Sequence, residues 1–393
     1  MTDPFPQPRP QAESPVVVQY CATFLKPEML HIYRQITGLK LYKPVVFAQK
    51  RENEEKFPFA DIRLFPKPRT HALRRIVQKQ VKRSPIQIYP SEAARLRAGL
   101  ASCGASLMHI YFGHIAVHLL PLLRERNGRP PVVVSFHGAD AMVDLGKSNY
   151  LAATREMLGL ADLVLARSES IAERLAAAGC DRGKLRIHRT GIPLGELQFR
   201  QRAAPPAEWR FVQACRLIPK KGLATSLRAF ARFARYSPDS VFAIAGEGPM
   251  LEELTRLASE LGVGGKVKFT GFLSQADLRK LYDESHVFLH PSELGADGNQ
   301  EGVPNSMLEA MATGMPVLAT RHGGIPEAVE SSGILVAEGD EEALAQAMRD
   351  LALNPERYAG MSAAARREVS AKFELGAQVR ALEGFYAEAI NKR

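Results

Sequence analysis

Cysteine is scarce in this chain, and the four that occur form no recognisable metal or redox motif. They lie at Cys21, Cys103, Cys180 and Cys215 among 393 residues, and no two are spaced as C-x-x-C. This spacing excludes paired-cysteine zinc sites and dithiol redox chemistry. Isolated thiols of this kind are typical of a reducing compartment, which favours a cytoplasmic protein.

Long apolar runs and acidic metal motifs are also lacking. No run approaches the roughly 20 apolar residues that a membrane-spanning helix needs. The polar, proline-rich residues 1–15 lack the basic start and apolar stretch of a secretory signal, and we expect this segment to be a disordered arm. No D-x-D triad occurs, so we expect neither a metal-bridged diphosphate nor a bound cofactor.

Positive charge is in excess, because 52 lysines and arginines against 42 acids give a net charge of +10. Such an excess indicates an anionic partner: nucleic acid, anionic lipid or a phosphorylated small molecule. The basic stretch Lys67–Arg83 contains no acid. It is either a solvated helix face or a peripheral anchor on the inner face of the plasma membrane, where a lipid-linked acceptor would lie. No nucleic-acid-binding motif or aromatic stacking platform occurs, so nucleic acid is not the expected partner.

Short apolar runs alternate with helix-like stretches along the whole chain. Strands are expected at 16–20, 45–48, 108–112, 131–136, 162–166, 185–189, 211–214, 241–245, 267–269, 287–290 and 316–320. Strands that alternate with helices form mostly parallel sheets covered on both faces. The length exceeds what one core usually supports. The sequence therefore predicts an α/β protein of two Rossmann-like, doubly wound domains, at 1–200 and 208–374, joined by a polar linker at 198–206.

Ligands of such sheets bind at the carboxyl ends of the strands, so the cleft between the domains is the expected site. The segment Glu301-Gly-Val-Pro-Asn-Ser-Met-Leu-Glu309 follows the strand at 287–290 and leads into a helix. Asn305 is a suitable N-cap, and the free amides of a helix start favour phosphate. Glu301 and Glu309 can accept hydrogen bonds from hydroxyls. From the residues alone, a capped helix beside solvated acids is the simpler explanation.

Other strands also end in polar groups. Arg216 and Lys221 follow the strand at 211–214, where two cations can clamp a diphosphate, whereas we expect Lys220 to be a solvated surface lysine. His137-Gly138-Ala139-Asp140 follows the strand at 131–136. A lone histidine at such a place is often a satisfied core residue, although Gly138 allows a ligand to approach closely.

The turn Gly246-Glu247-Gly248 is a weak nucleotide signal, because Leu251 stands where the dinucleotide fingerprint needs its third glycine. An NAD enzyme is therefore disfavoured.

The segment 301–309 resembles the E-x7-E signature of retaining glycosyltransferases of family 4, which have the GT-B fold. The surroundings are similar as well, through the helix at 307–313, the strand at 317–320 and His322-Gly-Gly-Ile-Pro-Glu327. The resemblance covers most of residues 130–345. It is nearest to bacterial exopolysaccharide transferases of the colanic-acid type.

This resemblance implies roles within the segment. Glu301 would contact the donor sugar, and Glu309 would bind the ribose hydroxyls. The loop residues Val303, Pro304 and Asn305 would contact sugar and diphosphate.

The resemblance also implies roles outside the segment. Arg216 and Lys221 would neutralise the leaving diphosphate beside Gly246 and Gly248. Gly271, Phe272 and Leu273 would form the turn that binds the base. His137 would face the donor sugar, and Asp140 would orient His137 or contact the acceptor. A core role for Phe272 is an equal alternative.

The implied activity is metal-independent transfer of a sugar, with retention, from a UDP- or GDP-sugar to a hydroxyl of a glycan or lipid-linked acceptor. The helix at 375–393 would cross back to the first domain. Relatives carry a glycine-rich loop after the first strand, where this chain has Cys21-Ala-Thr-Phe-Leu-Lys-Pro27. Alternatives are a nucleotide-sugar epimerase or phosphorylase of the same fold, a basic nucleic-acid-binding protein, and a non-catalytic relative.

Overall fold

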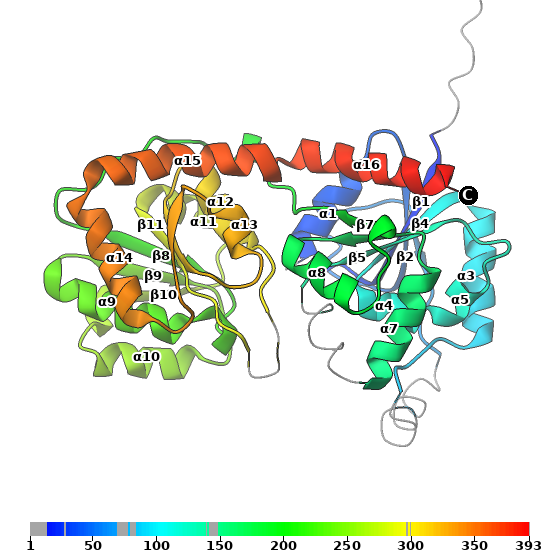
Figure 1. The fold of residues 1–393 in the computed structure, drawn as a ribbon, viewed down its shortest axis with the longest axis horizontal. Helices are drawn as coiled ribbons and strands as arrows, with labels where there is room; N and C mark the ends of the chain where they lie inside the picture. Colours follow the sequence, from blue (N-terminus) through cyan, green and yellow to red (C-terminus); the bar gives the residue numbers. More distant parts are fainter. Residues whose placement is uncertain are drawn as a thin grey trace, which may run out of the picture.

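Two parallel β-sheets, one in each half of the chain, organise the molecule (Figure 1). The computed structural model describes residues 14–26, 29–68, 78, 84–138, 140, 148–295, 298 and 300–392. Helices cover both faces of each sheet, as expected for strands that are apolar along their whole length. The α/β class predicted from the alternation of strands and helices is confirmed.

The first sheet has seven strands in the order β3-β2-β1-β4-β5-β6-β7, and every neighbouring pair is parallel. The strand order reverses between β1 and β4, which is where doubly wound sheets open a crevice at their carboxyl ends. The strands are β1 (Val16–Phe24), β2 (Lys43–Arg51), β3 (Ile62–Leu64), β4 (Ala105–Tyr111), β5 (Val132–Phe136), β6 (Leu163–Ala166) and β7 (Leu185–Ile187). The helices are α1 (Leu30–Thr37), α3 (Pro90–Ser102), α4 (Gly113–His118), α5 (Leu120–Arg124), α7 (Ser148–Leu160) and α8 (Glu169–Ala177).

The second sheet has six parallel strands in the order β10-β9-β8-β11-β12-β13, with its reversal between β8 and β11. The strands are β8 (Arg210–Ala214), β9 (Val241–Ala245), β10 (Val267–Gly271), β11 (Val287–His290), β12 (Val317–Thr320) and β13 (Gly333–Val336). The helices are α9 (Leu223–Tyr236), α10 (Leu251–Glu260), α11 (Gln275–Glu284), α12 (Asn305–Ala312), α13 (Ile325–Ala328), α14 (Glu341–Leu353) and α15 (Pro355–Phe373).

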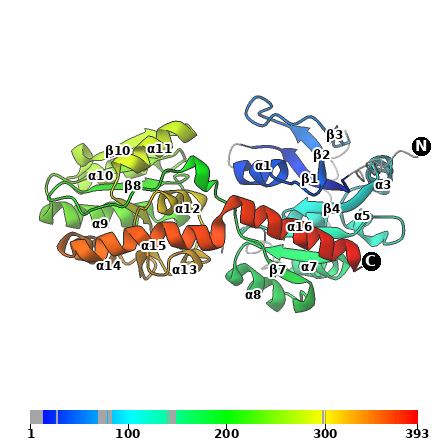
Figure 2. The same cartoon turned by 90° about the horizontal axis from the view of Figure 1, so that it is seen from above.

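The last helix, α16 (Leu375–Asn391), leaves the second unit and lies across the first (Figures 1 and 2). Its apolar side, with Leu382 and Tyr386, packs against buried residues of β1, β4, β5 and β6. The break from α15 falls at Glu374, whose side chain caps α16 by accepting the N–H groups of residues 376 and 377. Ile192 pairs with this break, since its N–H donates to Phe373 and its carbonyl accepts from Leu375. The two chain crossings between the units therefore lie side by side.

Several elements differ from the sequence-based expectation. Strand β13 is not among the strands expected from the sequence, and residues 113–124 form two short helices, α4 and α5. The strand β3 and the helices α1 and α7 were not anticipated. The arm at residues 1–13 and most of the basic stretch Lys67–Arg83 lie outside the described residues.

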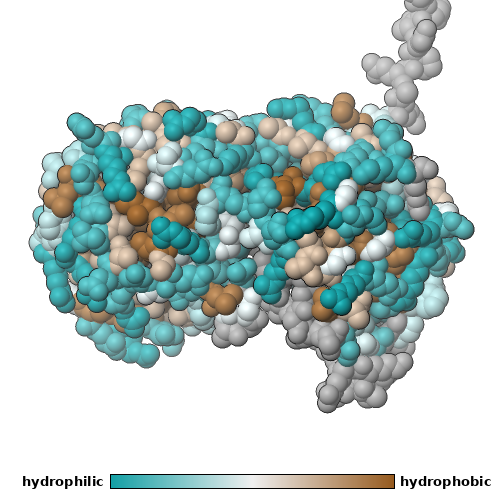
Figure 3. Space-filling view, viewed as in Figure 1, coloured by the Kyte–Doolittle hydropathy of each residue, from teal (hydrophilic) through white to brown (hydrophobic). Residues whose placement is uncertain are grey.

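The face seen in Figure 3 is mostly hydrophilic, with hydrophobic residues in small scattered groups. Among the helices that the structure describes, none combines the length and the apolar character needed to cross a bilayer.

Candidate active site

A cavity of about 640 Å³ opens between the two units, at the carboxyl ends of both sheets. Residues from both units line it. The first unit contributes Leu30, His31, Arg34, Lys56 and residues 190–192, and the second contributes Ala214, Cys215, Arg216, Ala245, Gly246, Glu247, Phe272, Leu273, Gln275, Leu278, Asn305, Ser306 and Glu309. Six of the predicted site residues are in this lining. The other seven, His137, Asp140, Lys221, Gly248, Glu301, Val303 and Pro304, are not.

Glu301 lies beside two lysines at the end of β8. Lys221 Nζ is 2.6 Å from Glu301 Oε2, and Lys220 Nζ is 3.6 Å from the same oxygen. Burial acts to raise the pKa of Glu301, but the two lysines outweigh it and hold the pKa at about 2. The carboxylate is therefore an anion throughout the physiological range. The expectation of a solvated Lys220 is wrong, because the short 3-10 turn Pro219–Lys221 directs both lysines to one carboxylate.

The loop that carries Glu301 is held from β12 and β13. The N–H of Glu301 donates to His322 Nε2 at 2.9 Å, and His322 Nδ1 lies 2.6 Å from Glu338 Oε1. Because Nε2 accepts, the imidazole proton is on Nδ1 and is donated to Glu338. Gly323 follows with φ +53°, and a Cβ there would lie 2.0 Å from the carbonyl oxygen of Glu301. The His322-Gly323 turn thus fixes the backbone at Glu301.

Helix α12 begins at Asn305, and the residue at its N-cap is Pro304. The prediction of Asn305 as the N-cap is wrong: the fixed φ of Pro304 suits it to end the loop, and Asn305 becomes the first helical residue. The Asn305 amide instead lies 3.4 Å from His31 Nδ1 of the first unit. Ser306 Oγ donates to the carbonyl of Ala214 at 2.6 Å and ties the helix start to β8.

Glu309, one turn into α12, is buried and faces Arg34 across the cleft at 3.6 Å. Burial raises the pKa of Glu309, while Arg34 and Arg279 act to lower it. Arg34 also pairs with Glu196 at 3.1 Å. Arg34 and His31 both belong to α1, so neither was identified from the sequence. Their three-residue spacing, which places them on one helix face, was the available signal.

His137 follows β5 and meets the Glu301 loop across the cleft. A Cβ at Gly302 would lie 3.4 Å from the carbonyl oxygen of His137. His137 Nδ1 is 3.4 Å from His31 Nε2, and desolvation lowers the pKa of His137 well below its ordinary value. Asp140 accepts three backbone N–H groups, from His137, Gly138 and Gly113, at 2.8–3.0 Å. Asp140 therefore holds the turn that presents His137.

The glycines of the β9 turn allow two loops to pack closely. A Cβ at Gly246 would lie 1.9 Å from the carbonyl oxygen of Cys215, and one at Gly248 would lie 2.4 Å from that of Leu217. Phe272 is 65% exposed at the cavity, which excludes the alternative of a core role.

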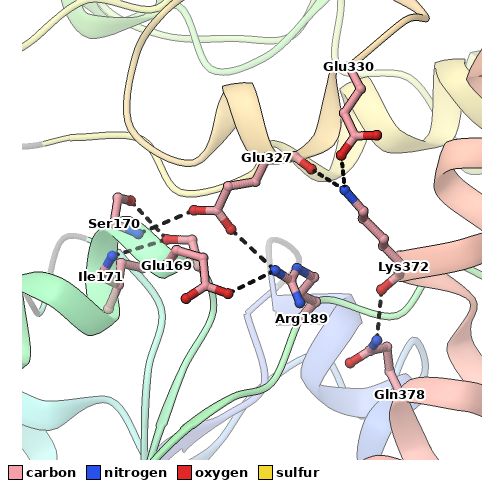
Figure 4. Close-up of polar contacts among 9 residues, drawn as sticks. Glu169, Ser170, Ile171, Arg189, Glu327, Glu330, Lys372 and Gln378 are labelled. Carbon is pink, nitrogen blue, oxygen red and sulfur yellow. Dashed lines mark hydrogen bonds and ion pairs between the residues drawn. The ribbon is translucent and has the colours of Figure 1, made fainter. Parts of the chain in front are cut away.

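A second contact between the units joins Glu327 to the start of α8 (Figure 4). Glu327 accepts the N–H of Ser170, in the first turn of α8, at 3.2 Å. Arg189 lies between Glu169 at 3.3 Å and Glu327 at 3.5 Å. Lys372 donates to the carbonyl of Glu327. The turn ending in Glu327 is thereby fastened to the first unit.

Solved structures identify the fold. HepE from Anabaena in complex with UDP superposes with a TM-score of 0.75 at 18% identity, over 95% of this chain and all of that chain. Sucrose-phosphate synthase from Thermosynechococcus elongatus gives 0.73 at 18% identity, over 96% and 100%. The architecture is the GT-B fold of glycosyltransferases.

Sequence relatives identify the family. The family model described as Glycosyltransferase Family 4 matches residues 40–196, and that for Glycosyl transferases group 1 matches 196–368. A protein of Escherichia coli named as a colanic acid biosynthesis glycosyltransferase, WcaL, is 32% identical over 68% of this chain and 67% of its own length. A GDP-mannose-dependent phosphatidylinositol monomannoside mannosyltransferase of Mycolicibacterium smegmatis is 34% identical over 65% and 70%. The chain belongs to the family 4 glycosyltransferases, which are enzymes that use nucleotide-sugar donors.

Proposed function

We propose that this enzyme transfers a sugar from a UDP- or GDP-sugar, with retention, to a hydroxyl of a glycan or lipid-linked precursor in exopolysaccharide assembly. One observation carries the proposal. Glu301, ionised and paired to Lys221, lies close to Cys215, which lines the cavity of about 640 Å³ together with Arg216 and Glu309.

The donor is proposed to lie along this cavity. The base would lie at Phe272 and Leu273. Glu309 would accept hydrogen bonds from the ribose hydroxyls instead of pairing with Arg34. Arg216 and Lys221 would bind the diphosphate, since charge-assisted contacts to phosphate oxygens are among the strongest hydrogen bonds. The donor sugar would reach Glu301, near Asn305.

The proposed reaction needs no metal, because the lysine pair and Arg216 supply cationic charge where the leaving diphosphate develops its own. The bond between the anomeric carbon and the phosphate oxygen breaks. A bond to the acceptor oxygen forms on the same face, and the acceptor proton passes to the departing phosphate oxygen. Glu301, as a fixed anion, would stabilise the positive charge that develops on the sugar ring.

A lipid-linked acceptor is proposed on two grounds. The mannosyltransferase relative is named for a phosphatidylinositol-based acceptor. Residues 67–83 carry seven basic residues and no acid, which suits a peripheral position on the anionic inner face of the plasma membrane.

The test is a screen of UDP-, GDP- and ADP-sugars for binding and for slow hydrolysis, followed by transfer to glycan acceptors. Proton NMR of the product would give the anomeric configuration. We expect one donor to bind, and the product to keep its anomeric configuration. An inverted product would contradict the retaining assignment. Consumption of the donor to a second nucleotide sugar, without any acceptor, would instead identify the epimerase alternative.

A further inference from the structure

A chain of buried hydrogen bonds links the C-terminal helix to the cleft histidine. On α16, the Tyr386 hydroxyl lies 2.7 Å from His109 Nδ1. His109 Nε2 lies 3.0 Å from Ser135 Oγ, which in turn lies 3.0 Å from His137 Nε2. Tyr386, His109 and Ser135 are buried at the centre of the first unit. Neither the fold nor the proposed donor contacts explain so many polar groups there.

The chain continues beyond Tyr386 to a buried arginine. Gln19 Nε2 donates to the Tyr386 hydroxyl at 3.2 Å, and Gln19 Oε1 accepts from the Tyr111 hydroxyl at 2.9 Å. Gln35 Nε2 donates to the Tyr111 hydroxyl at 3.0 Å. Arg167 Nη2 donates to Gln35 Oε1 at 3.5 Å.

Arg167 sets the direction of the links as far as Tyr386, because a guanidinium can only donate. Gln35 must therefore present its oxygen to Arg167 and its NH₂ group to Tyr111. The Tyr111 hydroxyl, having accepted that bond, donates its own O–H to Gln19 Oε1, and the NH₂ group of Gln19 then faces Tyr386. Tyr386 is left with one O–H to donate, and of its two acceptors His109 Nδ1, at 2.7 Å, lies closer than Gln19 Oε1, at 3.4 Å.

The order of donation extends through the two histidines. Burial lowers the pKa of His109 well below its ordinary value, and desolvation does so for His137, so each ring carries one proton. His109 accepts at Nδ1 and must donate from Nε2 to Ser135. Ser135 then donates to His137 Nε2. The single proton of His137 is left on Nδ1, the nitrogen that faces His31 in the cleft.

We propose that this one-way chain locks His137 as the Nδ1–H tautomer, so that its cleft-facing nitrogen is a hydrogen-bond donor to an oxygen of the bound nucleotide sugar. Tyr386, His109 and Ser135 are positioning residues that act through His137. The inference rests on the proposed function for what His137 contacts. The tautomer itself is defined without any substrate.

The test is NMR of the full chain labelled with ¹⁵N-histidine, with the His137 signals assigned through His137→Gln. In the wild type we expect a protonated, pyrrole-type Nδ1 and an unprotonated, pyridine-type Nε2. Tyr386→Phe removes the directing hydroxyl and should give a mixture of tautomers at His137. It should also lower kcat/KM for the donor about fivefold to tenfold, as expected for one lost hydrogen bond to the bound donor.

Tyr42→Phe is the matched control, because the Tyr42 ring packs 5.5 Å from that of Tyr386 and its hydroxyl is not part of the chain. It should leave the His137 tautomer and kcat/KM as in the wild type. Ser135→Ala breaks the last link by a nearly isosteric change and should reproduce the mixture if Tyr386→Phe fails to fold.

The inference would be overturned if His137 of the wild type were protonated on Nε2. It would also be overturned if Tyr386→Phe and Ser135→Ala both left the tautomer of His137 unchanged. If the NMR spectra are as expected but the enzyme transfers no sugar, the proposed function is contradicted and the hydrogen-bond chain is supported.

Discussion

The pairing of Glu301 with two lysines makes a quantitative prediction about stability and pH. A pKa of about 2, against an ordinary value of 4.5, corresponds to about 3 kcal/mol of stabilisation by the ionised carboxylate. Because the folded-state pKa is depressed, this contribution is fully present above the unfolded pKa and is lost as the pH falls towards 2. About 2 kcal/mol of it should be gone at pH 3.

Glu301→Gln should therefore lower the free energy of unfolding by about 2–3 kcal/mol at pH 7. It should also abolish most turnover, since the neutral amide cannot stabilise a cationic sugar ring. The stability difference between variant and wild type should shrink between pH 5 and pH 3. Urea denaturation at pH 7, 5, 4 and 3 measures the first effect, and donor turnover at pH 7 measures the second.

Glu173→Gln provides the matched control. Glu173 pairs with Arg182 at 2.8 Å, but both side chains are about two-thirds exposed. Solvent screens such a pair, so this substitution should leave the free energy of unfolding nearly unchanged at each of these pH values. If the Glu301→Gln difference stayed constant from pH 7 to pH 3, the lysine pair would not be what holds Glu301 ionised.

Three further predictions concern the donor, the loop and the membrane. Glu309→Ala should weaken nucleotide-sugar binding about tenfold or more, because ribose hydroxyls would lose a buried acceptor; an unchanged Kd by calorimetry would refute the assignment. Gly323→Ala places a Cβ 2.0 Å from the carbonyl oxygen of Glu301 and should reduce kcat strongly. Gly339 also has a positive φ, but a Cβ there would meet no atom within 4 Å. Gly339→Ala should therefore cost only about 1 kcal/mol in the free energy of thermal unfolding. Equal activity loss in both would argue against the clash. The full chain should sediment with anionic vesicles at low salt and be released at high salt, and sedimentation unaffected by salt would exclude an electrostatic anchor at Lys67–Arg83.

Short apolar runs, separated by helix-like stretches, explain why most of the fold was predictable. The central strands are buried on both faces, so their sequences are short apolar runs that local reasoning detects. The strand β3 has only three residues, none of them buried, and carries no such signal.

Helix α1 buries few residues besides Ile32 and Ile36, and its other positions are polar because they face the cleft and the polar interior. With only eight residues, it is too short for its apolar spacing to stand out in a window of about 11–18 residues.

The site was less predictable, because much of it depends on contacts between distant segments. Lys220 and Lys221 are adjacent in sequence, and only the fold shows that both reach Glu301. Asn305 has the chemistry of an N-cap, but the preceding proline displaces it into the helix and towards His31. Local sequence gives the chemistry available at a position, whereas the partner of each side chain is set by tertiary packing.

The two groups proposed nearest to the donor sugar have fixed protonation states. The lysine pair keeps Glu301 an anion, with a pKa of about 2. Desolvation lowers the pKa of His137 well below its ordinary value, and the hydrogen-bond chain leaves its cleft-facing nitrogen already protonated. Neither group is suited to take up a proton at neutral pH, because an efficient general base has a pKa near the working pH. On the proposed reaction, the acceptor proton must therefore go to the departing phosphate, and Glu301 and His137 act by charge and by hydrogen bonding.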